Sequence, residues 1–222
     1  MFAACWSVKG GSGTTVVAAA LAVLLTRRSD DGVLLVDLAG DAPAALGLPE
    51  PDGPGLAGWF AAGASVPADG LGRLEVPVSA GLDLLPRGQG PLGPVERADV
   101  LADVLAAESR SVVIDVGVPR WGDDAVDPAA GVLATSATES LLVTRACYLS
   151  LRRLVAAPVR PSGVVLVTEA GRALGRHDIE QVIGVDVVAE ILVDPAVARA
   201  VDAGLLAGRL PRSLERALGR AA

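Results

Sequence analysis

The sequence of 222 residues predicts an α/β fold in which a single doubly wound, mostly parallel sheet is flanked by helices. Three observations predict this class. A hydrophobic content of 51% with 20% charged residues is enough to build a large buried core. Strand-like runs alternate with helical stretches, as in βαβ units. The run SVVID at 111–115 is apolar until its final carboxylate, which is typical of a parallel strand buried on both faces.

The N-terminal elements are the best defined. A short apolar strand at 2–8 leads through a glycine-rich loop into an apolar helix at 14–27. The run VLLV at 33–36 predicts a second strand, which ends at Asp37. This order of strand, glycine loop and helix is the context in which a phosphate-binding loop is expected.

Proline and glycine divide the middle of the chain. A loop at 49–55 precedes a helical patch at 56–62, and GLDLLPRG at 81–88 predicts a strand closed by Pro and Gly. A helix is expected at 95–107, because three of its aliphatic residues fall on one face. Trp59 and Phe60 are adjacent on the helical patch, so either both are core residues or one faces a partner surface.

The second half continues the alternation without an internal repeat or a domain boundary, so a single domain is expected over residues 1–222. The expected elements are strands at 111–115, 141–144, 163–168 and 186–192, helices at 149–157 and 178–183, and helical segments in the tail.

Composition excludes several classes of protein. The net charge of −7 and pI near 4.7 argue against broad, sequence-independent nucleic-acid binding. The longest strongly apolar stretch, 16–25, has the length of a core helix, so no transmembrane segment is expected. The N-terminus does not resemble a secretory signal. Cys5 and Cys147 lie in apolar contexts that suit buried thiols. We therefore expect a cytoplasmic protein.

The glycine loop carries the clearest chemical signal. Gly10, Gly11 and Gly13 allow a tight turn that aims backbone N–H groups at an anion, near the positive end of the following helix. Lys9 is the single lysine among 19 basic residues. The Thr15 hydroxyl is placed to reach a phosphate-bound Mg²⁺ ion.

Two strand-ending carboxylates accompany this loop. Asp37 and Asp115 each end a predicted buried strand, at the sheet edge where ligands of open α/β folds bind. Carboxylates there are suited to holding metal-bound water. Each feature also has an ordinary structural interpretation, because a glycine loop can serve only as a turn and a strand-ending Asp only as a helix cap.

The segment VKGGSGTT resembles the phosphate loop of the ParA/MinD ATPases, whose pattern is K-G-G-x-G-K-[ST], and VLLVDLAGD is similar to their second signature strand. The resemblance extends over nearly the whole chain, with SVVIDVGVP similar to the family's Walker B strand. It implies a ParA/MinD-like P-loop NTPase domain that binds ATP or ADP with Mg²⁺ and works as a molecular switch.

Site residues follow from the resemblance. It implies catalytic roles for Lys9 and Asp37 and Mg²⁺ ligation by Thr15, Asp37 and Asp115. In the family, the lysine that matches Lys9 reaches across a homodimer to the partner's phosphates. Nucleotide contacts are implied for the loop residues Lys9, Gly10, Gly11, Ser12, Gly13, Thr14 and Thr15.

The sequence departs from the family pattern at three positions. Thr14 occupies the place of the second lysine, which contacts the β- and γ-phosphates, and Ala39 replaces the second Asp of a D-x-D motif. Both departures remove groups associated with hydrolysis, so the ATPase is expected to be slow or inactive. Thr168 stands where many relatives have an Asn that reads adenine, so base specificity is open.

The resemblance implies intracellular positioning of a division site, a chromosome or a secretion apparatus, through a homodimer across the nucleotide face and a protein partner. A nucleotide-free dimeric adaptor and a slow ATPase that uses Lys9 remain alternatives. A membrane surface or DNA is a further alternative partner, with the protein then peripheral at the membrane. Basic candidates for such contacts are Arg145, Arg152, Arg153, Arg160, Arg212, Arg216 and Arg220.

Overall fold

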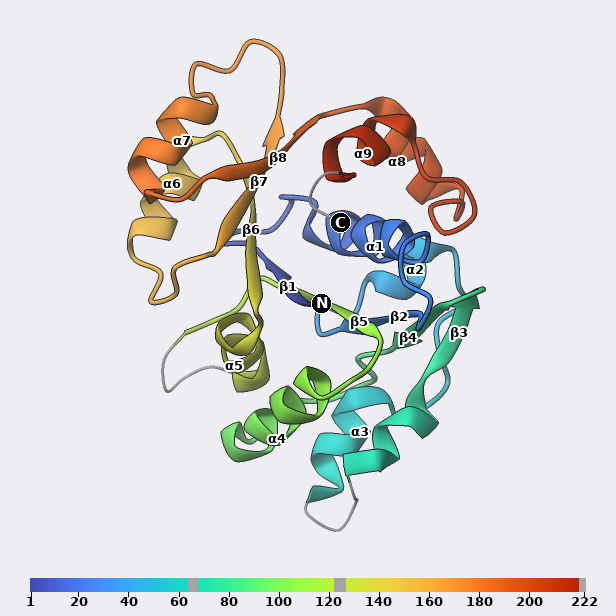
Figure 1. The fold of residues 1–222 in the computed structure, drawn as a ribbon. Coiled ribbons are helices and arrows are strands. Elements are labelled where there is room, and N and C mark those ends of the chain that lie inside the picture. The colour runs from blue at the N-terminus through green and yellow to red at the C-terminus, as the bar shows by residue number, and fades with distance from the viewer. Residues whose placement is uncertain (64–67, 122–126, 220–222) are drawn as a thin grey trace.

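A computed structural model describes residues 1–63, 68–121 and 127–219. The described residues form one twisted eight-stranded sheet with helices on both faces (Figure 1). Its strand order is β3-β4-β2-β5-β1-β6-β7-β8. Every described strand pair is parallel except the antiparallel pair β3 and β4 at one edge. The α/β class with a mostly parallel, doubly wound sheet is confirmed.

The described elements begin and end as follows. The strands are β1 (Phe2–Trp6), β2 (Val33–Asp37), β3 (Val76–Ser79), β4 (Leu82–Leu85), β5 (Ser111–Gly117), β6 (Glu139–Arg145), β7 (Gly163–Thr168) and β8 (Val187–Leu192). The helices are α1 (Thr14–Leu25), α2 (Ala42–Leu46), α3 (Gly55–Ala61), the 3₁₀ helix η2 (Ala68–Leu74), α4 (Val95–Ala106), α5 (Pro128–Ser136), α6 (Tyr148–Val155), α7 (Arg176–Ile183), α8 (Pro195–Asp202) and α9 (Arg212–Leu218).

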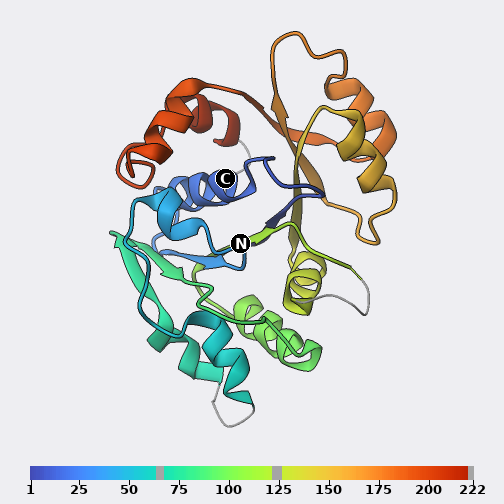
Figure 2. The same ribbon diagram turned by 180° about the vertical axis from the view of Figure 1, so that it is seen from behind.

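The helices divide between the two faces of the sheet. Helices α1, α2, α8 and α9 gather on one face, and the view from behind shows α3, α4, α5, α6 and α7 on the other (Figure 2). Alternate residues of a strand point to opposite faces, so each central strand contributes to both cores. In β5, for example, Val113 belongs to the core beneath α1, whereas Ile114 belongs to the core beneath α4 and α5.

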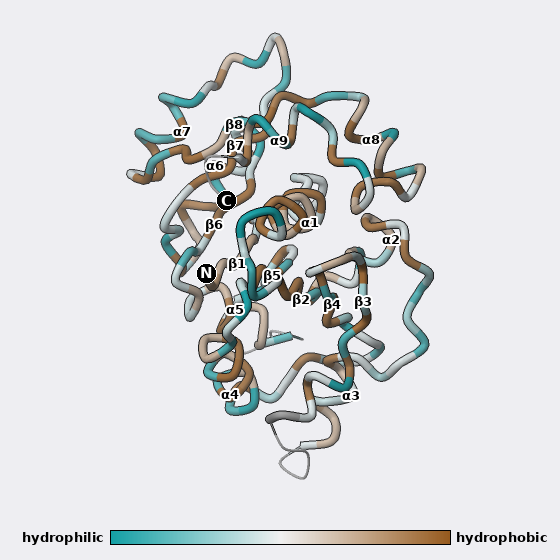
Figure 3. Tube along the Cα trace, turned by 45° about the vertical axis from the view of Figure 1, so that its right-hand side comes forward, coloured by the Kyte–Doolittle hydropathy of each residue, from teal (hydrophilic) through white to brown (hydrophobic). Residues whose placement is uncertain are grey.

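Helix α1 is buried almost all round because the sheet lies on one side of it and α2 and α9 pack on the other. Its residues from Val17 to Leu25 are all buried, and the tube is mostly brown along α1 and the central strands (Figure 3). A helix in this position needs apolar residues on every side, which explains why its sequence lacks an amphipathic pattern.

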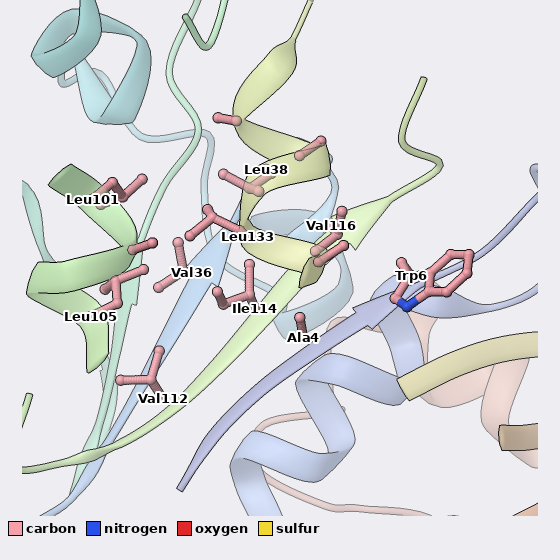
Figure 4. Packing of buried hydrophobic residues seen from close by; sticks show 14 of the residues in the cluster. Ala4, Trp6, Val36, Leu38, Leu101, Leu105, Val112, Ile114, Val116 and Leu133 are labelled. Atoms are coloured by element: carbon pink, nitrogen blue, oxygen red, sulfur yellow. The ribbon is translucent and has the colours of Figure 1, made fainter. Parts of the chain in front are cut away.

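The opposite core packs α4 and α5 against the middle of the sheet. Leu101 and Leu105 of α4 and Leu133 of α5 face Val36 and Ile114 of the strands (Figure 4). Truncating a fully buried leucine of this kind to alanine costs about 2–5 kcal/mol of stability. This packing fixes the carboxyl ends of β2 and β5, where the predicted site residues lie.

The expected strands and helices are present within a few residues of their predicted bounds, but four described elements were not expected: α2, η2, β3 and α5. Edge strand β3 contains Pro77, whose missing N–H suits an edge position. Trp59 and Phe60 are both buried, so the core interpretation of this pair is correct.

Candidate functional site

A cavity of 690 Å³ opens at the carboxyl ends of β1, β2 and β5. Three segments form most of its wall: the glycine loop after β1, the loop after β2 and the loop after β5. The lining residues are Ser7, Gly10 to Val16, Leu38, Ala39, Asp41, Arg87, Val116 to Arg120, Asp127 and Ala130. This is the sheet edge where open α/β folds bind ligands.

The glycine loop is held open toward the cavity by its backbone and by two serines. Gly11 and Gly13 have φ angles of 76° and 85°, a region that other residues enter at a cost. The hydroxyls of Ser7 and Ser12 both donate to the Lys9 carbonyl at 3.0 Å. A Cβ atom built on Gly10, Gly11 or Gly13 would meet nothing within 4 Å. The loop therefore has the shape and the space to surround an anion.

Asp37 and Asp115 lie side by side beneath the cavity, as register partners in adjacent strands, and both are fully buried. The Asp37 carboxylate accepts hydrogen bonds from the Gly40 and Ala42 amides at 2.7 and 3.2 Å. The Asp115 carboxylate accepts a hydrogen bond from the Gly117 amide at 3.1 Å, and the nearby Thr15 side chain acts to lower the pKa of Asp115. Neither carboxylate belongs to the cavity wall.

Burial governs the protonation of this pair. Desolvation raises the pKa of Asp37 to about 6 and that of Asp115 to about 7, and the neighbouring Asp37 carboxylate contributes to the Asp115 shift. Asp115 Oδ2 has no hydrogen-bond partner among the described residues. A carboxylate oxygen and a hydroxyl are ligands of the kind that Mg²⁺ prefers, so Asp115 and Thr15 fit a Mg²⁺ ion that is also bound by phosphate oxygens.

Lys9 does not line the cavity. Its Nζ donates to the Gly10 carbonyl at 3.1 Å, and the side chain is half-buried. Its charge also lowers the pKa of the Cys147 thiol, where the Ser150 side chain and amide act more strongly. Contact between Lys9 and phosphate, within this chain or across a dimer, stays a prediction.

Two of the three departures from the family pattern, Thr14 and Ala39, line the cavity. Thr14 is buried at the start of α1 with 7% of its surface exposed, and Ala39 lies in the loop after β2. Gly117 approaches Ala39 so closely that a Cβ atom on residue 117 would lie 3.0 Å from the Ala39 Cβ. Asp41, also on the wall, is exposed. At residue 39 the cavity wall therefore carries only a methyl group, which packs closely against Gly117.

A second cavity, of 350 Å³, adjoins the other side of the glycine loop. Ser12, Gly13 and Arg145 share it with the apolar residues Ile191, Val193 and Val197. Thr168, the predicted substitute for an adenine-reading Asn, is not part of its wall, and its hydroxyl donates to the Ile191 carbonyl at 3.5 Å. Base specificity stays open.

Arg87 and Asp127 were missed from the sequence. Both line the main cavity, and their side chains form an ion pair of 2.8 Å between the loop after β4 and the start of α5. The signal at Arg87 was the LPRG segment that closes β4, since a cation at that strand end faces the same sheet edge. Asp127 gave no usable signal because α5 itself was not expected.

Three of the seven basic candidates make contacts within the described chain. Arg145 pairs with Glu169 at 3.0 Å, and Arg160 donates to the Gly184 carbonyl at 2.8 Å. Arg153 donates to the Val8 carbonyl at 3.4 Å, which brings α6 close to the glycine loop. Arg220 lies outside the described residues.

Over the described residues, we find no helix with the length and apolar content to cross a membrane.

Comparison with known proteins decides the family. The sequence profile of the CobQ/CobB/MinD/ParA nucleotide binding domain matches residues 4–207. The chain belongs to this family. The resemblance read from its glycine loop and strands is thereby confirmed. No curated protein sequence matches the chain significantly.

Solved structures of the family share the fold at low sequence identity. A ParA family ATPase from Chlorobium tepidum TLS is 20% identical, with a TM-score of 0.73 over 97% of this chain and 94% of its own. The septum site-determining protein MinD from Pyrococcus horikoshii OT3, complexed with Mg-ADP, is 20% identical, with a TM-score of 0.69 over 97% and 92%. The ATP complex of an Asp-to-Ala variant of McdA from Cyanothece is 19% identical, with a TM-score of 0.70 over 99% of this chain and 96% of its own.

Proposed function

We propose that this protein is a positioning switch or scaffold that binds ATP or ADP with Mg²⁺ and hydrolyses ATP slowly or not at all. The observation that carries the proposal is the open glycine loop together with a buried Asp115 oxygen that has no hydrogen-bond partner in the described chain. A phosphate chain bound by the loop amides and a cation bound by Thr15 and Asp115 would satisfy both features.

Each residue has a defined part in this account. The amides from Gly10 to Thr15 bind phosphate oxygens. Thr15 ligates Mg²⁺, and Asp37 and Asp115 hold its water molecules or bind it directly. When bound, Mg²⁺ neutralises charge on the phosphates. Asp37 also fixes the loop after β2, since both of its oxygens accept amide hydrogen bonds from that loop.

Slow hydrolysis follows from the residues at the wall. Thr14 supplies no positive charge to the developing negative charge of phosphoryl transfer, and Ala39 has no group to orient an attacking water. Removing interactions that act mainly in the transition state lowers turnover but leaves ligand binding largely intact.

The wider role is proposed from the relatives. MinD of Aquifex aeolicus is known as a cell division protein and in a complex with MinC. We infer a homodimer across the nucleotide face and a protein partner for this chain, with cytoplasmic localisation. Lys9 lies outside the cavity wall, which supports a proposed contact with the phosphates of a second subunit rather than with those bound in its own cavity.

Calorimetry with Mg·ATP on the wild type and Lys9→Ala, followed by a phosphate-release assay, tests the proposal. If the protein is a switch, the wild type gives a heat of Mg·ATP binding. Its rate of phosphate release is then far below that of a Thr14→Lys/Ala39→Asp variant, which restores both absent groups. Rapid release in the wild type that depends on Lys9 would instead identify an ATPase. Absence of heat in the wild type would identify a nucleotide-free adaptor.

A further inference from the structure

Arg87 enters the nucleotide cavity from the side away from the glycine loop. It follows β4, and the strand order places β2 and β5 between β4 and β1, the strand that leads into the loop. Arg87 and the loop nevertheless line the same cavity. A phosphate chain that begins at the loop amides therefore meets Arg87 only at its far end.

The guanidinium joins three segments of the cavity wall. Arg87 Nη1 donates to the Leu38 carbonyl, and Nη2 donates to the Gly90 carbonyl at 3.3 Å and to Asp127 Oδ2 at 2.8 Å. The other Asp127 oxygen accepts from the Leu92 amide at 2.9 Å. Gly40 leaves room for the arginine stem, because a Cβ atom there would lie 3.2 Å from Arg87 Cδ.

The Arg87–Asp127 pair is suited to exchange with a ligand. The two side chains are 21% and 29% exposed, so the guanidinium is partly shielded and still reachable from the cavity. An arginine fork binds phosphate oxygens in the same two-pronged way as a carboxylate. Only Nη2 leaves Asp127 in this exchange, so Nη1 keeps its bond to the Leu38 carbonyl and the Leu92 amide keeps its bond to Asp127 Oδ1.

We propose that Arg87 binds the terminal phosphate of a nucleoside triphosphate, releases Asp127 on doing so, and thereby distinguishes ATP from ADP. This inference rests on the proposed nucleotide binding and names the cation that replaces the charge absent at Thr14. Because Arg87 also binds the Leu38 carbonyl, the terminal phosphate becomes linked to the loop after β2.

Three variants separate this role from a structural one. Arg87→Gln removes the charge and is expected to weaken Mg·ATP binding by about tenfold to a hundredfold, with Mg·ADP binding unchanged. Asp127→Asn keeps an acceptor for the Leu92 amide but removes the competing charge, so Mg·ATP binding tightens by up to about fivefold. Arg27→Gln breaks an ion pair of 2.9 Å with Glu215 outside the cavity and serves as the charge-matched control.

Calorimetric titration of the four proteins with Mg·ATP and with Mg·ADP measures these effects, and thermal unfolding checks that each variant is folded. Selective loss of ATP affinity in Arg87→Gln, with a gain in Asp127→Asn, supports the inference. Unchanged ATP affinity in both variants, or an equal loss for ATP and ADP, overturns it while the proposed function stands. If the wild type binds neither nucleotide, both fall. If Arg87→Gln does not fold, the Asp127→Asn result decides alone.

Discussion

The carboxylates of Asp37 and Asp115 are buried side by side at this sheet edge. Asp115 is fully buried beside Asp37, and one of its oxygens has no hydrogen-bond partner in the described chain. Burying two adjacent carboxylates without a cation is costly when both are ionised. A site kept in this state is better explained by a bound cation than by a contribution to stability.

The Asp37–Asp115 pair predicts that stability falls as pH rises. Both folded-state pKa values, about 6 and about 7, lie above the ordinary Asp value of 3.8. At pH values between the ordinary and the folded-state pKa, the folded protein therefore binds more protons than the unfolded chain. The free energy of unfolding therefore decreases from about pH 4 to about pH 7, by on the order of a few kcal/mol. Urea denaturation at pH 5 and pH 8 measures this.

The variant Asp115→Asn isolates the effect. Asn has almost the same shape and no charge, so we expect a flatter pH profile and a more stable protein at pH 8. A wild-type profile that rises between pH 5 and pH 8, or a variant with the same slope as the wild type, would refute the pKa assignment.

Prediction from sequence at the residue scale had a clear limit. The glycine loop, Thr15 and the two aspartates were singled out from the sequence because each belongs to or follows a strand with a recognisable apolar pattern. Arg87 and Asp127 come from segments far apart in the sequence, so only the packed fold reveals that they form a pair. A contact between residues this far apart in the sequence leaves no periodic pattern in a single sequence, so it cannot be predicted from one.

At the scale of elements, the turn between β1 and α1 shapes the glycine loop. Gly13 precedes the first helical residue with a φ of 85°, and its carbonyl accepts the Val17 amide at 2.9 Å. The left-handed conformation turns the chain from the loop into the helix. Residues with a Cβ atom enter this region at a cost of roughly 1–2 kcal/mol.

Gly13→Ala is therefore predicted to lower the free energy of unfolding by about 1 kcal/mol and to weaken Mg·ATP binding. Gly10→Ala is the matched control: its added Cβ also meets nothing within 4 Å, but Gly10 does not adopt a positive φ. Chemical denaturation and calorimetry compare the two. Equal stability of both variants would contradict the role given to the turn.

Elements with strong local patterns were predicted well, and those without them were missed. The apolar runs of β2 and β5 stand out in the sequence because both of their faces are buried. Helix α5, PAAGVLATS, is rich in small residues and lacks a polar face, so its pattern does not predict a helix. Strand β3 has four residues and a proline, and its pairing with β4 is what defines it.

The whole molecule gathers the Asp37–Asp115 pair, the glycine loop and Arg87 at one end of the sheet. Two cores of different composition hold that end in place, one built on α1 and the other on α4 and α5. The family fold thus accounts for where the cavity lies, and Thr14, Ala39 and Arg87 all line it. Binding without efficient turnover is the behaviour expected of this combination.

The central claim is that the loop amides bind the phosphates of a nucleotide. Backbone amide NMR of the isotope-labelled protein during titration with Mg·ATP tests it most directly. We predict that the resonances of residues 10–15 move strongly and saturate together, since their N–H groups gain charged acceptors. Saturating Mg·ATP that leaves these six resonances in place would contradict the account, whether or not amides elsewhere respond.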